Sequence, residues 1–149
     1  IVPWIIENGV PAENVHDYGM VSNHLMPKIF AEADVAVFPN RCEGGTNLVA
    51  MEAMASGLPC ILSANTGHLD LIDEDNCYPL LNQNKVAGLP YAKDWGESDV
   101  TEVVESLERV YIDRHEANSR GAQAAKFMQD WSWAKRTKYL IDKIDETSV

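Results

Sequence analysis

Two glutamates bracket a glycine turn in the most informative part of the sequence, residues 38–59. Glu43 stands in the turn before Gly44 and Gly45, and Glu52 lies about one turn into an expected helix. Ionised carboxylates only accept hydrogen bonds, so they suit ligands that offer hydroxyl groups. The two glycines lack the side chains that would keep a ligand away from the backbone.

The elements expected on either side of this turn place it where open α/β sheets bind ligands. A near-continuous apolar strand is predicted at residues 34–38, and a helix at residues 47–56 that Gly57 ends. Ligands in such sheets gather beyond the carboxyl ends of the strands. The unpaired N–H groups of a helix N-terminus carry partial positive charge and attract anions. The sequence therefore predicts a phosphate-binding site that needs no cationic side chain.

Apolar strands alternate with helices along the chain, which indicates an α/β fold. Further strands are predicted at 15–18, 59–63 and 78–81, with a loop at 82–96. Helices are predicted at 1–8, 22–32, 114–129 and 133–146. Ser98 is predicted to cap one more helix, whose apolar stripe is Val100, Val103, Val104, Leu107, Val110 and Tyr111. We expect one Rossmann-like domain, a parallel sheet with helices on both faces and a helical C-terminus.

The charge distribution argues against a nucleic-acid-binding protein. The 149 residues carry a net charge of −11, and residues 1–108 hold 17 acidic but only 4 basic side chains. A nucleic-acid-binding surface would instead form a basic stripe. Any diphosphate bound in this part of the chain has only Lys28, Arg41, Lys85 and Lys93 available as cations.

The cysteines and the hydropathy pattern indicate the cellular compartment of the protein. Cys42, Cys60 and Cys77 are odd in number and lack the spacing of a zinc site, so we expect reduced thiols. No apolar run approaches the roughly 20 residues that span a bilayer, and no signal peptide is recognisable. We expect a cytoplasmic protein, compatible with peripheral membrane association of the full enzyme.

Taken in order, these features make the sequence resemble the C-terminal, donor-binding domain of the GT-B-fold retaining glycosyltransferases of family 4. That family carries a glutamate, seven residues and a second glutamate before an Ala-Met-Ala-x-Gly-x-Pro run, here at residues 53–59. The resemblance includes residues 15–19, 33–35 and 66–70, and Trp131-Ser132-Trp133 before the last helix.

The resemblance implies roles for individual residues. Glu43 would be catalytic and lie against the donor sugar, and Glu52 would accept hydrogen bonds from the ribose hydroxyls. The residues implied in binding the rest of the nucleotide-sugar are Arg41, Gly44, Gly45, Thr46, Asn47, Leu48 and His68. The implied donor is a UDP- or GDP-sugar, with an unknown acceptor and with neither a metal nor another cofactor.

The sequence departs from the family pattern in three ways. Eight residues rather than seven separate Glu43 from Glu52, and Asp70 replaces the usual glutamate. The upstream Gly-Arg and Lys-Gly elements, two upstream strands and the acceptor domain are also absent. We therefore interpret residues 1–149 as part of a single nucleotide-sugar-binding domain. An uncovered strand edge would favour a homo-oligomer, unless the strands at 15–18 and 34–38 pair directly.

Alternative interpretations stay open at this point. The chain could be a nucleotide-sugar epimerase of the same fold, or a non-catalytic nucleotide-sugar-binding or assembly module. Arg41 could be a surface residue paired with Glu43, and His68 could be structural. Trp131 and Trp133 are most simply expected to anchor the final helix by burial. Because transfer needs both substrates held in place, we expect the isolated chain to be inactive.

Overall fold

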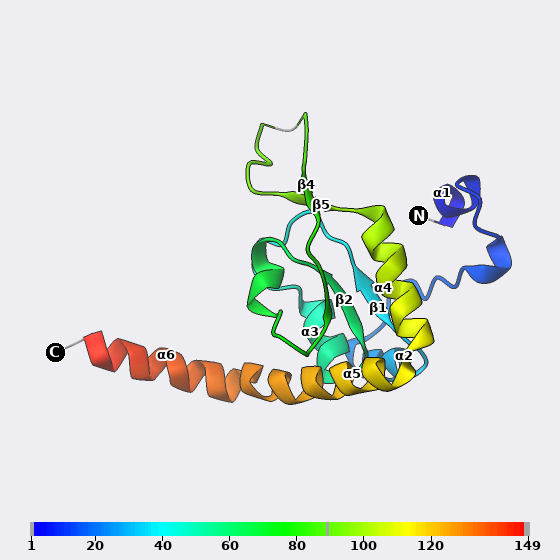
Figure 1. The fold of residues 1–149 in the computed structure, drawn as a ribbon. Helices are drawn as coiled ribbons and strands as arrows, with labels where there is room; N and C mark the ends of the chain where they lie inside the picture. The colour runs from blue at the N-terminus through cyan, green and yellow to red at the C-terminus, as the bar shows by residue number, and fades with distance from the viewer. Residues whose placement is uncertain (1, 89, 148–149) are drawn as a thin grey trace.

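The computed structural model describes residues 2–88 and 90–147 and is built on a three-stranded parallel sheet (Figure 1). The strands are β1 (Ala36–Phe38), β2 (Cys60–Ser63) and β3 (Tyr78–Leu80), in the spatial order β1-β2-β3. All neighbouring strands are parallel, so their carboxyl ends meet at one edge of the sheet, the carboxyl edge. The predicted α/β class is confirmed.

Helices cover both faces of this sheet, as predicted. One face packs against α2 (Met26–Ala31), α3 (Leu48–Ala55) and α5 (Arg114–Met128), and the other face against α4 (Val100–Ile112). The alternation of side chains along β2 supplies both cores: Cys60 and Leu62 join the first, and Ile61 joins the second. All of β2 is buried, which accounts for its apolar residues 60–62, and the buried hydroxyl of Ser63 donates to the Asn40 carbonyl at 2.7 Å.

Close packing of α3 against α5 depends on two glycines. Gly57 ends α3 with a φ of +77°, a left-handed conformation that glycine adopts without strain. Gly121 of α5 lies against this turn, and a Cβ at Gly121 would sit 2.1 Å from the carbonyl oxygen of Gly57. A side chain at residue 121 would therefore force the two helices apart.

The expectation of a plain loop at residues 82–96 was wrong. Strands β4 (Gln83–Lys85) and β5 (Gly96–Ser98) form an antiparallel pair, and residues 86–95 between them project from the body (Figure 1). Polar strands this short have no apolar alternation that would have revealed them. Asp99, rather than the predicted Ser98, caps α4 by accepting from the N–H groups of Thr101 and Glu102.

The N-terminal segment lies apart from the sheet (Figure 1). It contains α1 (Val2–Glu7) and the short 3-10 helices η1 (Ala12–Asn14) and η2 (Asn23–Leu25). The strand predicted at 15–18 is absent, and this segment does not pair with β1. A strand requires a neighbour for its backbone groups, and here the segment has none.

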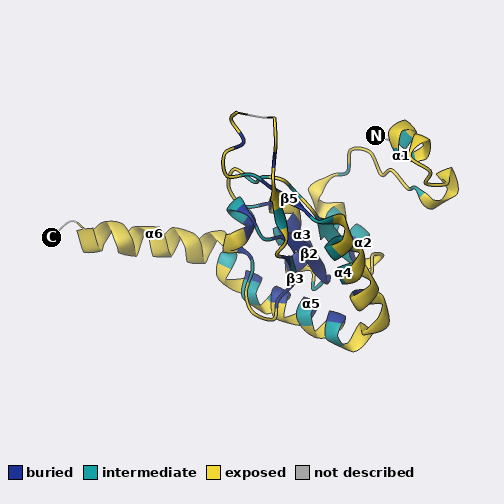
Figure 2. Cartoon of the chain, turned by 45° about the horizontal axis from the view of Figure 1, so that its top comes forward, coloured by how far each residue is buried: buried dark blue, intermediate teal, exposed yellow. Residues whose placement is uncertain are grey.

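The C-terminal part follows the predicted helix boundaries but buries less than expected. After the 3-10 helix η4 (Gln129–Trp131), α6 (Trp133–Thr147) extends away from the body and has no buried residue (Figure 2). Trp131 packs against the core, with the Arg136 guanidinium 3.9 Å from its ring centre. Trp133 is 88% exposed, so its predicted anchoring by burial was wrong.

The predicted apolar stripe of α4 is likewise only partly covered. Val103 and Val110 pack on the sheet, whereas Val100, Val104 and Tyr111 are exposed. Among the described residues, no helix is long and apolar enough to cross a membrane.

The three cysteines are free, as expected. Cys60 and Cys77 lie in the core, where burial raises the pKa of both thiols to about 12. These two side chains therefore stay protonated and serve as small apolar groups.

Candidate functional site

Two neighbouring loops at the carboxyl edge of the sheet form the candidate site. The Glu43 loop (residues 39–47) joins β1 to α3, and the His68 loop (residues 64–70) follows β2 and contains the 3-10 helix η3 (Thr66–Asp70). The backbone N–H of Glu43 donates to Thr66 Oγ1 at 2.8 Å, and that of Gly67 donates to the Glu43 carbonyl at 3.3 Å. The two loops are thus held together directly.

Unpaired backbone N–H groups gather at the start of α3. Within the described part of the chain, the N–H groups from Gly44 to Val49 have no hydrogen-bond acceptor. The next N–H, of Ala50, donates to the side chain of Asn47 at 3.1 Å, and Met51 donates to its carbonyl at 2.9 Å. The helix N-terminus therefore presents a row of free donors, which suits an anion.

The glycines of the two loops have opposite surroundings. A Cβ at Gly44 or Gly45 would meet nothing within 4 Å, so both positions are open to an approaching ligand. A Cβ at Gly67 would lie only 1.3 Å from the carbonyl oxygen of Gly45. Gly67 is therefore needed for the loops to pack, which sequence reasoning did not recognise.

His68 lies inside the protein and cannot contact a ligand directly. The side chain is fully buried, and both ring nitrogens have partners. Nδ1 lies 3.1 Å from the Ser63 carbonyl, which can only accept, so Nδ1 carries the hydrogen. Nε2 then accepts from Asn47 Nδ2 at 3.1 Å, because Asn47 Oδ1 is occupied by the N–H of Ala50.

This arrangement favours the neutral imidazole. Burial lowers the pKa of His68, and the hydrogen bond to Ser63 and the charge of Glu43 oppose that shift only in part. A protonated Nε2 would face the amide hydrogens of Asn47. The structural interpretation of His68 is thus the one that the contacts favour, and its role toward the donor is indirect, through the cap of α3.

Glu43 and Glu52 lie on different sides of the α3 N-terminus. The Glu43 carboxylate accepts from Asn40 Nδ2 at 2.6 Å and is half-buried. Glu52, also half-buried, lines an open hollow of about 550 Å³ together with Asn23, Met26 and Pro27. The volume is of the order that small-molecule sites have.

Only part of the apolar α3 helix is buried. Ala50, Ala53 and Met54 are buried, whereas Leu48 is 68% exposed and Ala55 is exposed as well. Leu48 stands at the first position of the helix, so its side chain is open to a ligand held by the free N–H groups.

The proposed pairing of Arg41 with Glu43 was wrong. The Arg41 guanidinium forms an ion pair with Glu97 of β5, with Nε at 3.1 Å from the carboxylate. Arg41 is exposed at the rim of the site, 56 residues away in sequence from its partner.

A match to a protein-family model shows which family this chain belongs to. The model described as glycosyl transferases group 1 matches residues 5–92, more than half of the chain. The chain belongs to this family. No curated protein matches the sequence.

A solved structure supports the fold of this family member. The chain is similar to sucrose-phosphate synthase from Thermosynechococcus elongatus, with a TM-score of 0.74 and 21% sequence identity. The match covers 99% of this chain and 34% of the synthase chain, so the chain spans about a third of that protein's length. The expected architecture, part of a GT-B glycosyltransferase, is confirmed.

Three residues that build the candidate site were not singled out from sequence. Asn40 orients Glu43, and Thr66 joins the loops while holding a φ of +39°, which is strained for a β-branched residue. Asn65 is buried and donates to the Asn40 carbonyl at 2.9 Å. Their common signal is a small polar residue two or three positions after the carboxyl end of a strand.

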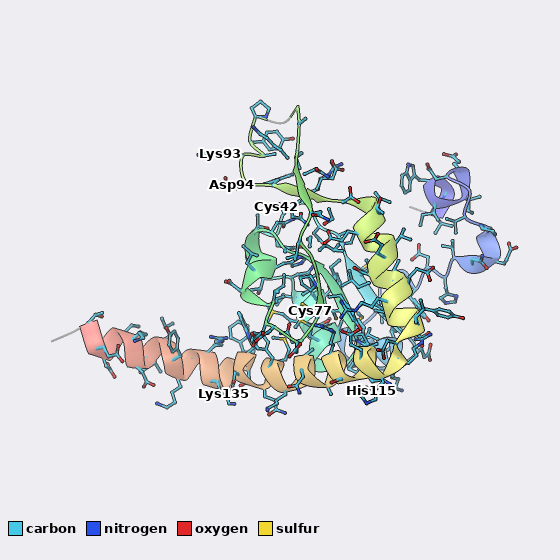
Figure 3. The ribbon with its side chains drawn as sticks, viewed as in Figure 1. Cys42, Cys77, Lys93, Asp94, His115 and Lys135 are labelled. Carbon is cyan, nitrogen blue, oxygen red and sulfur yellow. The ribbon has the colours of Figure 1, made fainter. Side chains whose placement is uncertain are left out.

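An acidic triplet in the sequence lies away from this site. Asp73-Glu74-Asp75 precedes β3, at the amino edge of the sheet, and Figure 3 shows Cys77 nearby and Cys42 at the opposite edge. Asp75 lies 3.9 Å from Arg120. Among the described residues, no group of three or more acidic, histidine or cysteine side chains could hold a metal. The metal-free site stays a prediction.

Proposed function

We propose that this chain binds the nucleotide-diphosphate-sugar donor of a retaining glycosyltransferase. The diphosphate lies at the free N–H groups of Gly44 to Val49, and Glu52 accepts hydrogen bonds from the ribose hydroxyls. Glu43 contacts the donor sugar as the catalytic residue, and Thr46 and Leu48 line the path between the two carboxylates. The donor is a UDP- or GDP-sugar.

The observation that carries this proposal is the row of unpaired backbone donors at the start of α3. A diphosphate needs many hydrogen bonds, and an acidic surface offers few cations for it. Backbone N–H groups and the helix dipole stabilise negative charge without any side chain. The open surroundings of Gly44 and Gly45 allow the phosphates to approach the main chain.

The hollow beside Glu52 supports a nucleoside position. Met26 and Phe30 supply apolar surface for a base, and Glu52 is an acceptor for a diol with two O–H donors. The hollow lies on α3 beyond the free N–H groups. Base, ribose and diphosphate can therefore follow one another along a single helix.

Calorimetric titration with UDP and GDP tests the donor site. Glu52→Ala should weaken nucleotide binding about tenfold or more, because hydrogen bonds to a charged group contribute about 1.5–3 kcal/mol. Glu108→Ala is the matched control, since Glu108 is an exposed helical glutamate on α4. Equal binding by Glu52→Ala and the unchanged protein would overturn the proposal.

We also expect this 149-residue chain to show no appreciable transfer on its own. Holding donor and acceptor in reactive geometry contributes up to about 7–11 kcal/mol, and an acceptor site is needed for it. The β1 edge of the described sheet is unpaired, which favours self-association. Turnover assays over an acceptor panel, run with light scattering, test both points. Robust transfer by a strictly monomeric chain would contradict them.

A further inference from the structure

The described residues between β4 and β5, 86–88 and 90–95, form an arm that stands beside the candidate site (Figure 1). It follows closely on β3, so it rises from the carboxyl edge of the sheet. Figure 3 shows Lys93 and Asp94 on the arm and Cys42 of the Glu43 loop below it. The arm was unassigned in sequence reasoning, and the donor site described above does not use it.

The base of the arm is fastened to both loops of the site. The backbone N–H of Gly96 donates to the Arg41 carbonyl at 3.0 Å, and Arg41 pairs with Glu97. The buried side-chain amide of Asn65 lies 2.8 Å from Gln83 Oε1 and 3.2 Å from the Gly96 carbonyl. The arm therefore has a fixed root within the site.

An open hollow of about 720 Å³ lies against the arm. The residues that line it begin with Lys85 and end with Lys93. Between them, Val86 and Ala92 are buried, at 5% and 2% exposure. Beside β5, outside the lining of the hollow, Trp95 donates its backbone N–H to the Ala92 carbonyl at 3.3 Å, and its ring packs edge-on against Tyr91. The hollow thus combines ordered apolar walls with two cations.

The position of these lysines is unusual given the charge of the chain. Residues 1–108 contain only four basic side chains against 17 acidic ones. Three of the four, Arg41, Lys85 and Lys93, lie on the arm or at its root. Within the described residues, neither lysine has an ion-pair partner. Asp94 does not line the hollow, and Glu97 is paired with Arg41.

We propose that the arm is a phosphate-binding site in which Lys85 and Lys93 hold the phosphoryl group of a substrate. This inference rests on the proposed function, because it assigns a substrate group to the rim of the donor site. Two unpaired ammonium groups on one hollow match the charge of a dianion, and charge-assisted hydrogen bonds to it are stronger than those between neutral groups. The phosphoryl group belongs either to a phosphorylated acceptor or to the donor diphosphate.

Titrations of the full 149-residue chain with glucose 6-phosphate, glucose and UDP test the proposal. The Lys85→Gln/Lys93→Gln double variant should weaken binding of a phosphate probe about tenfold or more, because two charge-assisted contacts are lost. Lys28→Gln, on α2 and outside the arm, is the control and should leave binding unchanged. Glucose should not bind, and higher salt should weaken phosphate binding.

The pattern of losses identifies the source of the phosphate. If the double variant loses affinity for glucose 6-phosphate but not for UDP, the arm binds a phosphorylated acceptor. If it loses affinity for UDP, the arm contacts the donor diphosphate. Unchanged affinity for both probes, or no binding of either, overturns the proposal. If Glu52→Ala loses UDP binding while the double variant keeps its affinity for both probes, the arm proposal fails and the donor site stands. If Glu52→Ala binds UDP unchanged, the donor site fails.

Discussion

The Glu43 loop and the His68 loop lie side by side at the carboxyl edge but differ in how their polar groups are used. The His68 loop is internally satisfied: both nitrogens of His68 and the amide of Asn65 are bonded within the protein. The Glu43 loop keeps the N–H groups from Gly44 to Val49 free within the described chain. A loop whose key polar side chains are bonded within the protein thus supports an open one, as expected of a preorganised binding site.

This comparison predicts its largest effect at the point where the loops touch. Gly67→Ala should lower the free energy of unfolding by about 3 kcal/mol, because the new Cβ would overlap the Gly45 carbonyl and the loops must separate. Gly44→Ala is the matched control in the open loop and should change stability by less than about 0.5 kcal/mol. Urea denaturation measures both. Similar losses at the two glycines would show that the loops are not in contact.

A second prediction concerns the pH dependence that His68 contributes. Its pKa is lowered in the folded protein, so between the folded and unfolded pKa values the unfolded chain binds more protons. The stabilisation is complete above pH 6.5 and decreases as the pH falls below this value. His68→Gln should therefore be less stable than the unchanged protein at pH 7, and the difference should shrink toward acid pH. An NMR titration that gives His68 a pKa above 6.5 would contradict this account.

A third prediction separates the two functions of the Asn47 side chain. Asn47→Ala should lower stability by about 1–2 kcal/mol, since it removes the cap of α3 and leaves His68 Nε2 without a donor. Asn47→Asp keeps a cap acceptor but places a carboxylate beside Nε2, so it should raise the pKa of His68. Denaturation and histidine NMR measure these effects. An unchanged histidine pKa in Asn47→Asp would rule out the Asn47–His68 contact.

The smallest effect is expected at the rim of the Glu43 loop. Arg41→Gln removes an ion pair whose two side chains are about half exposed, so stability should fall by less than about 1 kcal/mol. Glu97→Gln should lower stability by a similar amount. The Arg41→Gln/Glu97→Gln double variant should lose little more stability than either single variant. A loss of several kcal/mol in either single variant would mean that the arm root depends on this pair.

Local sequence signals were sufficient for much of the body. The helix at 47–56 was predicted from its apolar residues and from Gly57, and the structure has it at Leu48–Ala55. The buried strand at β2 followed from its unbroken apolar run. These signals act within a few residues, where propensity and capping determine the structure.

The errors arose where distant parts of the chain decide the structure. Residues 15–18 have the composition of a strand but no partner, and Trp133 has an aromatic side chain but no core beside it. Arg41 pairs with a residue 56 positions away, a contact that no local pattern reveals. For His68, sequence left a ligand role and a structural role open, and the contacts with Ser63 and Asn47, distant in sequence from one another, favour the structural one.

The most direct test of the account is an amide NMR titration of the 15N-labelled chain with UDP. If the start of α3 holds the diphosphate, the amide signals of Gly44, Gly45, Leu48 and Val49 should shift downfield as they gain an acceptor. The amide of Ala50, already bonded to Asn47, should move little and serves as the internal control. Saturable UDP binding that leaves the Gly44 to Val49 signals unchanged would contradict the central claim.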